Sequence, residues 1–124
     1  MIKFFALILL FVLPLAAKSE WEKLEETPSA VIYIDHDRIS KNAQFPTVWM
    51  LSDFKEKNKR GVLSTQVLNE FNCEEKMRRT IAFTSHKENM AGGKAIFKSL
   101  LAGKWHPINH DSVAYKMMHL ACES

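Results

Sequence analysis

The sequence predicts an α+β fold, mainly β, in which an antiparallel sheet of about six strands is followed by one C-terminal helix. Three observations support this prediction. Apolar and polar residues alternate with a period of two along most of residues 21–100, which is typical of half-buried strands. Short polar or glycine-containing segments interrupt the alternation, as hairpin connections do. After Pro107 the apolar residues change to helical spacing.

The first three predicted strands are Trp21–Glu25, Ala30–Asp35 and Thr47–Phe54. The turns between and after the first two fall at residues 27–29 and 35–37. In the third strand both faces carry apolar residues, with Val48 and Met50 on one face and Trp49 on the other. We therefore expect this strand to lie inside the sheet and to be covered on both sides.

The next three predicted strands are Val62–Cys73, Met77–Lys87 and Lys94–Leu100. They are separated by a polar loop ending at Gly61, a tight turn at 74–76 and the pair Gly92-Gly93. In the first of these strands Leu63, Val67 and Phe71 share one parity, and polar residues such as Ser64 occupy the other. Short connections of this kind predict antiparallel neighbours.

A helix is predicted at the C-terminal end of the chain. Asp111 or Ser112 can cap its first turn. Its apolar positions share one face by helical spacing, and they are Val113, Met117, Leu120 and Ala121. This stripe is expected to pack on one face of the sheet.

Residues 1–19 have the composition of a cleavable signal peptide. Lys3 supplies a positively charged start, and Phe4–Leu13 is an unbroken apolar run. The small residues that follow predict cleavage after Ala17 or Ser19. The apolar run is shorter than the roughly 20 residues that a spanning helix needs, so no stable transmembrane anchor is expected.

Residues 20–124 are therefore expected to form one exported domain, in the periplasm or on the outer surface. Lys3 is the only charged residue among residues 1–17, so after cleavage at Ala17 the chain keeps 16 of its 17 Lys and Arg residues against 14 Asp and Glu residues, a net charge of +2. The basic runs Lys55–Arg60 and Lys76–Arg79 are short and interrupted. Nucleic acid is not an expected partner, because proteins that bind it concentrate positive charge on one face.

Cys73 and Cys122 are the two cysteines of the chain. In an exported protein such a pair most often forms a disulfide, because the compartment is oxidising. Neither residue has the C-x-x-C or C-x-x-H spacing of a metal pair or a reactive thiol. The predicted bond would fasten the end of the helix to the sheet and contribute about 4 kcal/mol to stability.

Several short pieces of the chain occur in a characteristic order: Trp21, Tyr33-Ile34-Asp35, Ile39, Val48–Phe54, Ser64, Glu70–Cys73, Trp105, Pro107, Ser112-Val113 and Cys122. Together they resemble the surface-adhesin protein E-like family of small exported Gram-negative proteins, over about residues 21–122. The resemblance implies an antiparallel sheet with a C-terminal helix and a Cys73–Cys122 bridge. It also implies kinship with an outer-surface adhesin.

Five histidines raise the question of a metal site: His36, His86, His106, His110 and His119. His106 and His110 are four residues apart, but Pro107 between them disfavours a continuous helix. His36 lies in an Asp-rich turn, which more often caps its own backbone than binds a cation. No third ligand follows at a recognisable spacing, so no metal site is predicted.

The chain shows no catalytic motif. A nucleophile needs an adjacent base and an orienting group, and neither G-x-S-x-G nor H-E-x-x-H occurs. Glu74 and Glu75 are adjacent, so as strand residues they would point to opposite faces. Gly92-Gly93 is interpreted as a turn rather than a phosphate loop. We therefore expect neither an enzyme nor a cofactor.

Trp21, Trp49 and Trp105 are the residues most expected to affect both stability and contacts. Trp49 is expected in the core. For Trp105 the sequence leaves two interpretations open, namely packing the helix onto the sheet or anchoring a partner. An uncovered sheet edge could also pair with a second copy and give a homodimer.

The leading functional hypothesis is an exported, non-enzymatic protein that binds an unidentified macromolecule at the envelope or at a host surface, as an adhesin does. The alternative is a periplasmic carrier of a small ligand or metal, which would use the sheet face or the histidines. No ligand-binding residues are assigned from the sequence.

Overall fold

The computed structural model describes residues 20–41 and 44–123, so the predicted signal peptide at 1–19 lies outside the described residues. The strands are β1 (Trp21–Glu26), β2 (Ala30–Asp35), β3 (Thr47–Phe54), β4 (Ser64–Asn72), β5 (Met77–His86), β6 (Ala95–Ser99) and β7 (His106–Pro107). The helices are η1 (His36–Arg38), η2 (Asn89–Ala91) and α1 (Val113–Cys122). The predicted α+β, mainly β fold is confirmed.

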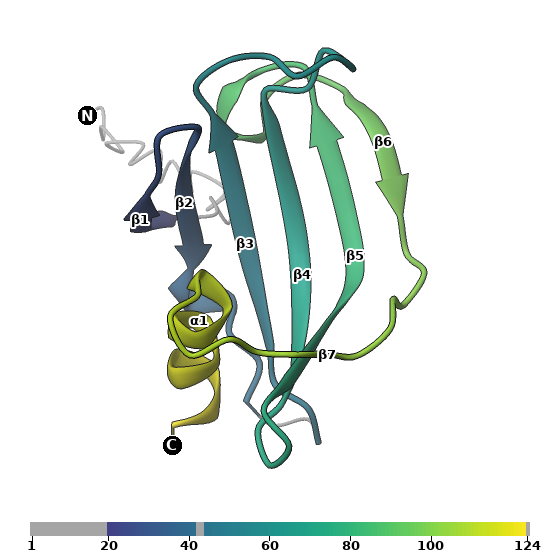
Figure 1. Ribbon diagram of the computed structural model, residues 1–124. Helices are drawn as coiled ribbons and strands as arrows, with labels where there is room; N and C mark the ends of the chain where they lie inside the picture. Colours follow the sequence, from purple (N-terminus) through teal and green to yellow (C-terminus); the bar gives the residue numbers. More distant parts are fainter. Residues whose placement is uncertain (1–19, 42–43, 124) are drawn as a thin grey trace, which may run out of the picture.

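The strands form one antiparallel sheet in the order β1-β2-β3-β4-β5-β6 (Figure 1). Sequence neighbours are therefore also neighbours in space, as the short connections predict. The two-residue β7 pairs with the start of β5. It is a seventh strand that the sequence analysis does not predict, because two residues containing a proline carry no alternating pattern.

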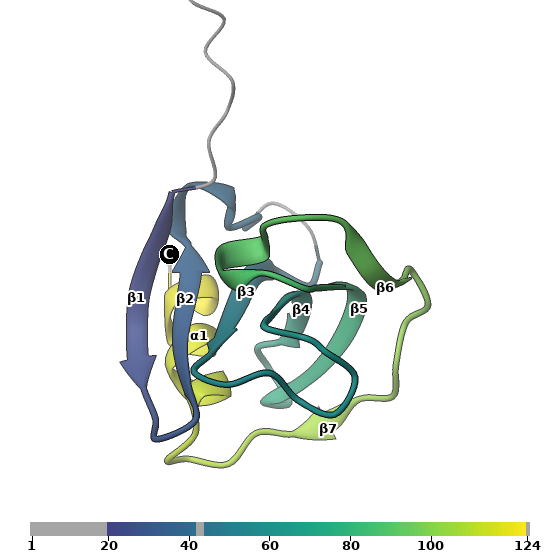
Figure 2. The same ribbon diagram turned by 90° about the horizontal axis from the view of Figure 1, so that it is seen from above.

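The helix α1 packs on one face of the sheet, near β1, β2 and β3 (Figures 1 and 2). Its buried side chains contact Ile34, Val48 and Phe71 from three adjacent strands. Val48 and Phe71 are completely buried. These residues form the main hydrophobic core of the described domain.

The buried stripe of α1 is rotated from the predicted one. The fully buried positions are Ala114, Met117, Met118 and Ala121. The predicted members Val113 and Leu120 lie at the border of the core and are only partly buried. Both pack against the core as predicted, while small and flexible residues, Ala and Met, occupy the closest approach to the sheet.

Two local features hold α1 in place. Ser112 is the N-cap, and its Oγ accepts a hydrogen bond from the Tyr115 backbone N–H at 3.2 Å. At the other end Cys122 forms the disulfide with Cys73, which follows β4. The bond joins residues 49 apart in sequence with a Cα–Cα distance of 5.8 Å. The predicted disulfide is confirmed.

Candidate functional site

The tryptophan side chains gather on the sheet face that α1 does not cover. Val48 and Met50 contact the core beneath α1, so Trp49, which lies between them on β3, points to the opposite face. Trp49 is half-buried rather than enclosed in the core as expected. The described α-helix, α1, lies on the other face of the sheet (Figure 2).

Arg38 brings Trp21 and Trp49 together. Its guanidinium carbon lies 5.6 Å from the centre of the Trp21 ring and 5.3 Å from the centre of the Trp49 ring. Arg38 Nε also donates a 2.6 Å hydrogen bond to the carboxylate of Asp35, which is buried. A buried carboxylate needs such a partner, so Asp35 fixes the cation between the two rings.

A second aromatic cluster forms around Trp105 on the same face. Glu70 lies opposite Thr47 in the β3–β4 register, and Thr47 points to the same sheet face as Trp49. Glu70 therefore points to that face too. Arg79 Nε donates a 2.7 Å hydrogen bond to the Glu70 carboxylate, and its guanidinium carbon lies 4.5 Å from the Trp105 ring centre. This geometry holds the half-buried Trp105 over the sheet.

Phe45 completes the second cluster. Its ring meets that of Trp105 edge to face, with the centroids 5.1 Å apart and an angle of 66° between the planes. Of the two interpretations left open for Trp105, its ring contacts therefore do not support packing of α1 onto the sheet. They place it with residues of the opposite face.

We call the surface formed by both clusters the aromatic face, and its members are Trp21, Arg38, Phe45, Trp49, Arg79 and Trp105. Trp and Arg are the side chains most often found to dominate the energy of protein interfaces. Trp presents a large rigid area at a low entropic cost, and Arg adds several hydrogen-bond donors in a planar arrangement. The arrangement can bind a partner, but it contains no nucleophile with an adjacent base.

The other end of this sheet face is closed by η2. Asp53 Oδ1 accepts hydrogen bonds from the Asn89 side chain at 2.9 Å and from the Met90 backbone N–H at 2.8 Å. Ser64 Oγ accepts from the Ala91 N–H and donates to the Glu88 carbonyl oxygen. Ser64 is therefore buried. The open part of the face is the end that carries the tryptophans.

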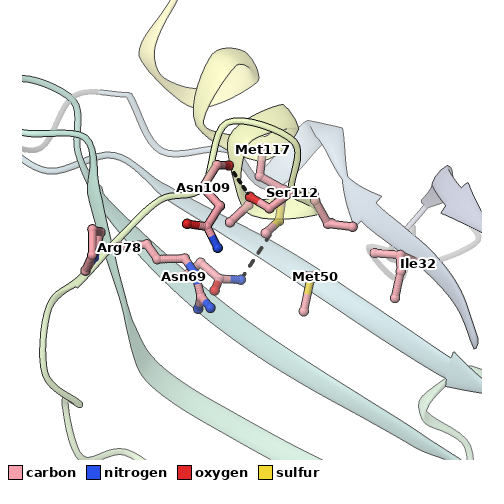
Figure 3. Close-up of a pocket in the computed structure, with 10 residues that line it drawn as sticks. Ile32, Met50, Asn69, Arg78, Asn109, Ser112 and Met117 are labelled. Carbon is pink, nitrogen blue, oxygen red and sulfur yellow. Dashed lines mark hydrogen bonds between the residues drawn. The ribbon is translucent and has the colours of Figure 1, made fainter. Parts of the chain in front are cut away.

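A separate cleft of about 290 Å³ opens between α1 and the sheet (Figure 3). It is lined by Ile32, Met50, Asn69, Arg78, Pro107, Asn109, Ser112, Val113, Ala114 and Met117. Asn69 is buried, and its Nδ2 has only long contacts, 3.5 Å to the Val67 carbonyl oxygen and 4.0 Å to Met117 Sδ. None of the lining residues is an Asp, Glu, His or Cys, so the cleft has no acid–base pair. The alternative of a periplasmic carrier that uses the sheet face or the histidines stays a prediction.

The family follows from a comparison along the whole folded domain. A family model described as surface-adhesin protein E matches residues 21–123. The chain belongs to the surface-adhesin protein E family. None of the curated proteins compared with the chain matches it.

A solved structure of protein E from Haemophilus influenzae has the same fold as this chain. The two superpose with a TM-score of 0.58 at 14% sequence identity, over 82% of this chain and 95% of the other. At this identity the likeness shows the fold alone. It agrees with the antiparallel sheet and C-terminal helix described above.

The histidines of this family member do not form a metal cluster. His86 is buried and its Nε2 lies 3.0 Å from Thr84 Oγ1, whereas His110 stacks on Tyr115 with the ring centres 4.5 Å apart. The ring of His119 meets that of Tyr115 edge to face, with the centroids 4.6 Å apart. Across residues 20–41 and 44–123, no three His, Cys, Asp or Glu side chains come together as a metal site.

One carboxyl with a strongly perturbed pKa, that of Glu26, lies at the opposite end of β1 from Trp21. Hydrogen bonds from Lys23 and Lys55, with their positive charges, lower the pKa of the Glu26 carboxyl from 4.5 to about 2. The same interaction with Glu26 raises the pKa of Lys23. These exposed groups connect the β1–β2 hairpin to the loop after β3.

Several members of the aromatic face escape sequence reasoning. Arg38, Arg79 and Phe45 are not singled out, because cation–π and ring contacts depend on which strands become neighbours. The alternation in β3 does give the direction of Trp49. Arg79 lies opposite Glu70 in the β4–β5 register, and this pairing could have identified it. The pairing can be predicted only when the geometry of the β4–β5 turn is known.

Two further predictions bear on location and assembly. Within the described part of the chain, no helix has the length and apolar character needed to cross a membrane. The strands β1 and β6 form the two ends of the main sheet path. A homodimer that pairs such an edge with a second copy stays a prediction.

Proposed function

We propose that this protein is an exported, non-enzymatic, adhesin-like protein that binds a macromolecule at the cell envelope or at a host surface through the aromatic face. The observation that carries the proposal is the presence of all three tryptophans and two arginines on one uncovered end of the sheet. Membership of a family described as a surface adhesin supports a binding role. The predicted signal peptide supports export.

The geometry favours a macromolecular ligand over a small one. The members of the aromatic face come from β1, β3, β5 and the segments before β3 and after β6, so they are spread across several strands of the sheet. Interfaces between macromolecules are built around a few Trp and Arg anchors on such surfaces. The Asp35–Arg38 and Glu70–Arg79 pairs hold these anchors in place before a partner binds.

The test is a binding panel with the exported protein. Purified protein is immobilised and exposed to a broad set of host-matrix and envelope components, and any retained component is titrated. Trp105→Ala is expected to weaken Kd by about 30-fold or more, which is the size of an interface hot spot. Thermal unfolding verifies that the variant is folded.

Tyr115→Ala is the matched control, because Tyr115 is also a half-buried aromatic residue but lies on α1. It is expected to change Kd by less than about threefold. The proposal is overturned if no component of the panel is retained. It is also overturned if Trp105→Ala binds as tightly as the unaltered protein, or if both variants weaken binding equally.

A further inference from the structure

The edge of the sheet opposite β1 carries a run of exposed apolar side chains. Leu100 and Leu101 are 85% and 83% exposed, and Phe97 and Ile96 on β6 are 41% and 38% exposed. Single exposed apolar residues are ordinary on a protein surface, but here four large ones fall within six consecutive residues. They make an apolar patch along the edge strand and the loop after it, with Ile96 and Phe97 on the two faces of β6. In Figures 1 and 2 this stretch forms the outer edge of the molecule, on the side away from β1 and α1.

The loop that carries the two leucines is anchored on both sides. The Leu101 N–H donates to Ser99 Oγ at 3.2 Å. The Gly103 N–H donates to the Thr80 carbonyl oxygen at 2.8 Å, which ties the loop to β5. The leucines are therefore held outward by the fold, next to the end of β6.

Positive charge surrounds this patch. Residues 89–110 contain no Asp or Glu, and they include Lys94, Lys98 and Lys104. None of these three lysines forms an ion pair with a described residue. The guanidinium of Arg60, from the loop after β3, lies 5.4 Å from the Phe97 ring centre and adds a fourth cation. We call this surface the basic apolar rim, defined by Arg60, Lys94, Ile96, Phe97, Lys98, Leu100, Leu101 and Lys104.

We propose that the basic apolar rim binds the surface of an anionic phospholipid bilayer. Leu100 and Leu101 enter the boundary between headgroups and acyl chains, and the lysines remain at the level of the phosphates. Anionic lipid complements the unpaired positive charge of the rim. Neither the aromatic face nor its ligand is needed for this binding, so it goes beyond the proposed function.

A bilayer fits the two leucines better than a pocket in a protein partner does. They are adjacent in the loop after β6, and each is more than four-fifths exposed, so neither packs against the rest of the described domain. A pocket in a protein partner has to match the shape of both side chains at once. The interfacial region of a bilayer is fluid and accepts both.

The test is flotation of the exported protein with lipid vesicles. Vesicles of phosphatidylcholine containing about 30% phosphatidylglycerol are compared with vesicles of pure phosphatidylcholine. We expect binding to the anionic vesicles that weakens strongly at about 0.5 M salt, because salt screens the lysines. Leu100→Ser with Leu101→Ser is expected to lower the partition coefficient by at least about tenfold, since the apolar contribution is lost.

The lysines are tested against a control of equal charge. Lys98→Gln with Lys104→Gln is expected to lower partitioning by about tenfold or more. Lys23→Gln with Lys116→Gln removes the same net charge from β1 and α1, and is expected to lower it by less than about threefold. Because the substituted side chains are exposed, all variants should unfold at nearly the same temperature as the unaltered protein.

Three results would overturn the proposal. The first is that the unaltered protein fails to float with anionic vesicles. The second is that the double leucine variant floats as well as the unaltered protein. The third is that both lysine pairs weaken binding equally, which would make net charge, rather than the rim, responsible. If the rim binds a protein partner and not a bilayer, the unaltered protein will fail to float, which is the first of these results.

Discussion

Reduction of the Cys73–Cys122 bond is expected to lower the free energy of unfolding by about 4 kcal/mol. The bond closes a loop whose ends are 49 residues apart, so its loss restores a large conformational entropy to the unfolded chain. It also releases Cys122, the last residue of α1, from the sheet. For a domain of this size such a loss is a large fraction of total stability.

The measurement is urea unfolding of the exported protein with and without reductant. A variant with Cys73→Ser and Cys122→Ser should match the reduced protein, and reductant should not change its midpoint. If the unaltered protein unfolds at the same urea concentration in both conditions, the disulfide does not stabilise this fold as described.

Phe71→Ala is expected to have a comparable effect, destabilising the protein by about 3–5 kcal/mol. Phe71 is completely buried on β4 and contacts the cluster that α1 forms with Ile34 and Val48. Truncation removes the largest side chain of this cluster and leaves a cavity that the rigid sheet cannot close. The loss should appear as a lower unfolding midpoint in urea with an unchanged slope.

Phe97→Ala is the matched control. Phe97 lies on the edge strand β6 with 41% of its surface exposed, so the same substitution should cost about 1 kcal/mol or less. Equal losses for the two variants would contradict the assignment of the core to the interface between α1 and the sheet.

Most of the fold could be predicted from local sequence because the sheet is built from consecutive strands. The alternation in Ala30–Asp35 and Thr47–Phe54 predicts strands that the structure places with the same bounds. Each strand pairs with the next, so short turns determine the order. Ser112 could be named as one of two caps because its hydroxyl acts within one turn of the helix.

Features that depend on contacts distant in sequence could not be predicted. The alternation along β4 predicts that Ser64 lies on the polar face of the strand. It is buried because η2, more than 20 residues later, folds over it and hydrogen-bonds its hydroxyl. The rotation of the buried stripe on α1 has a similar origin. Ala114 and Met118 are buried because the sheet lies against them, and helical spacing alone does not distinguish them from Val113 and Leu120.

The candidate site was only partly visible in the sequence for the same reason. The tryptophans could be singled out by residue type, and the direction of Trp49 follows from strand alternation. The pairing of Arg38 with Trp21 and Trp49 depends on the turn after β2, and that of Arg79 with Trp105 depends on the path of the chain after β6. Neither path is encoded in a local motif.

The most direct measurement of whether the aromatic face binds the partner is oxidative footprinting with a component retained in the binding panel. Oxidation rates of individual side chains are measured by mass spectrometry in the free protein and at saturating ligand. We predict that Trp49 and Trp105 become protected, while Tyr115 on α1 oxidises at the same rate in both states. Protection of Tyr115 with unchanged rates at both tryptophans would show that the partner binds elsewhere, and would contradict a binding role for the sheet face opposite α1.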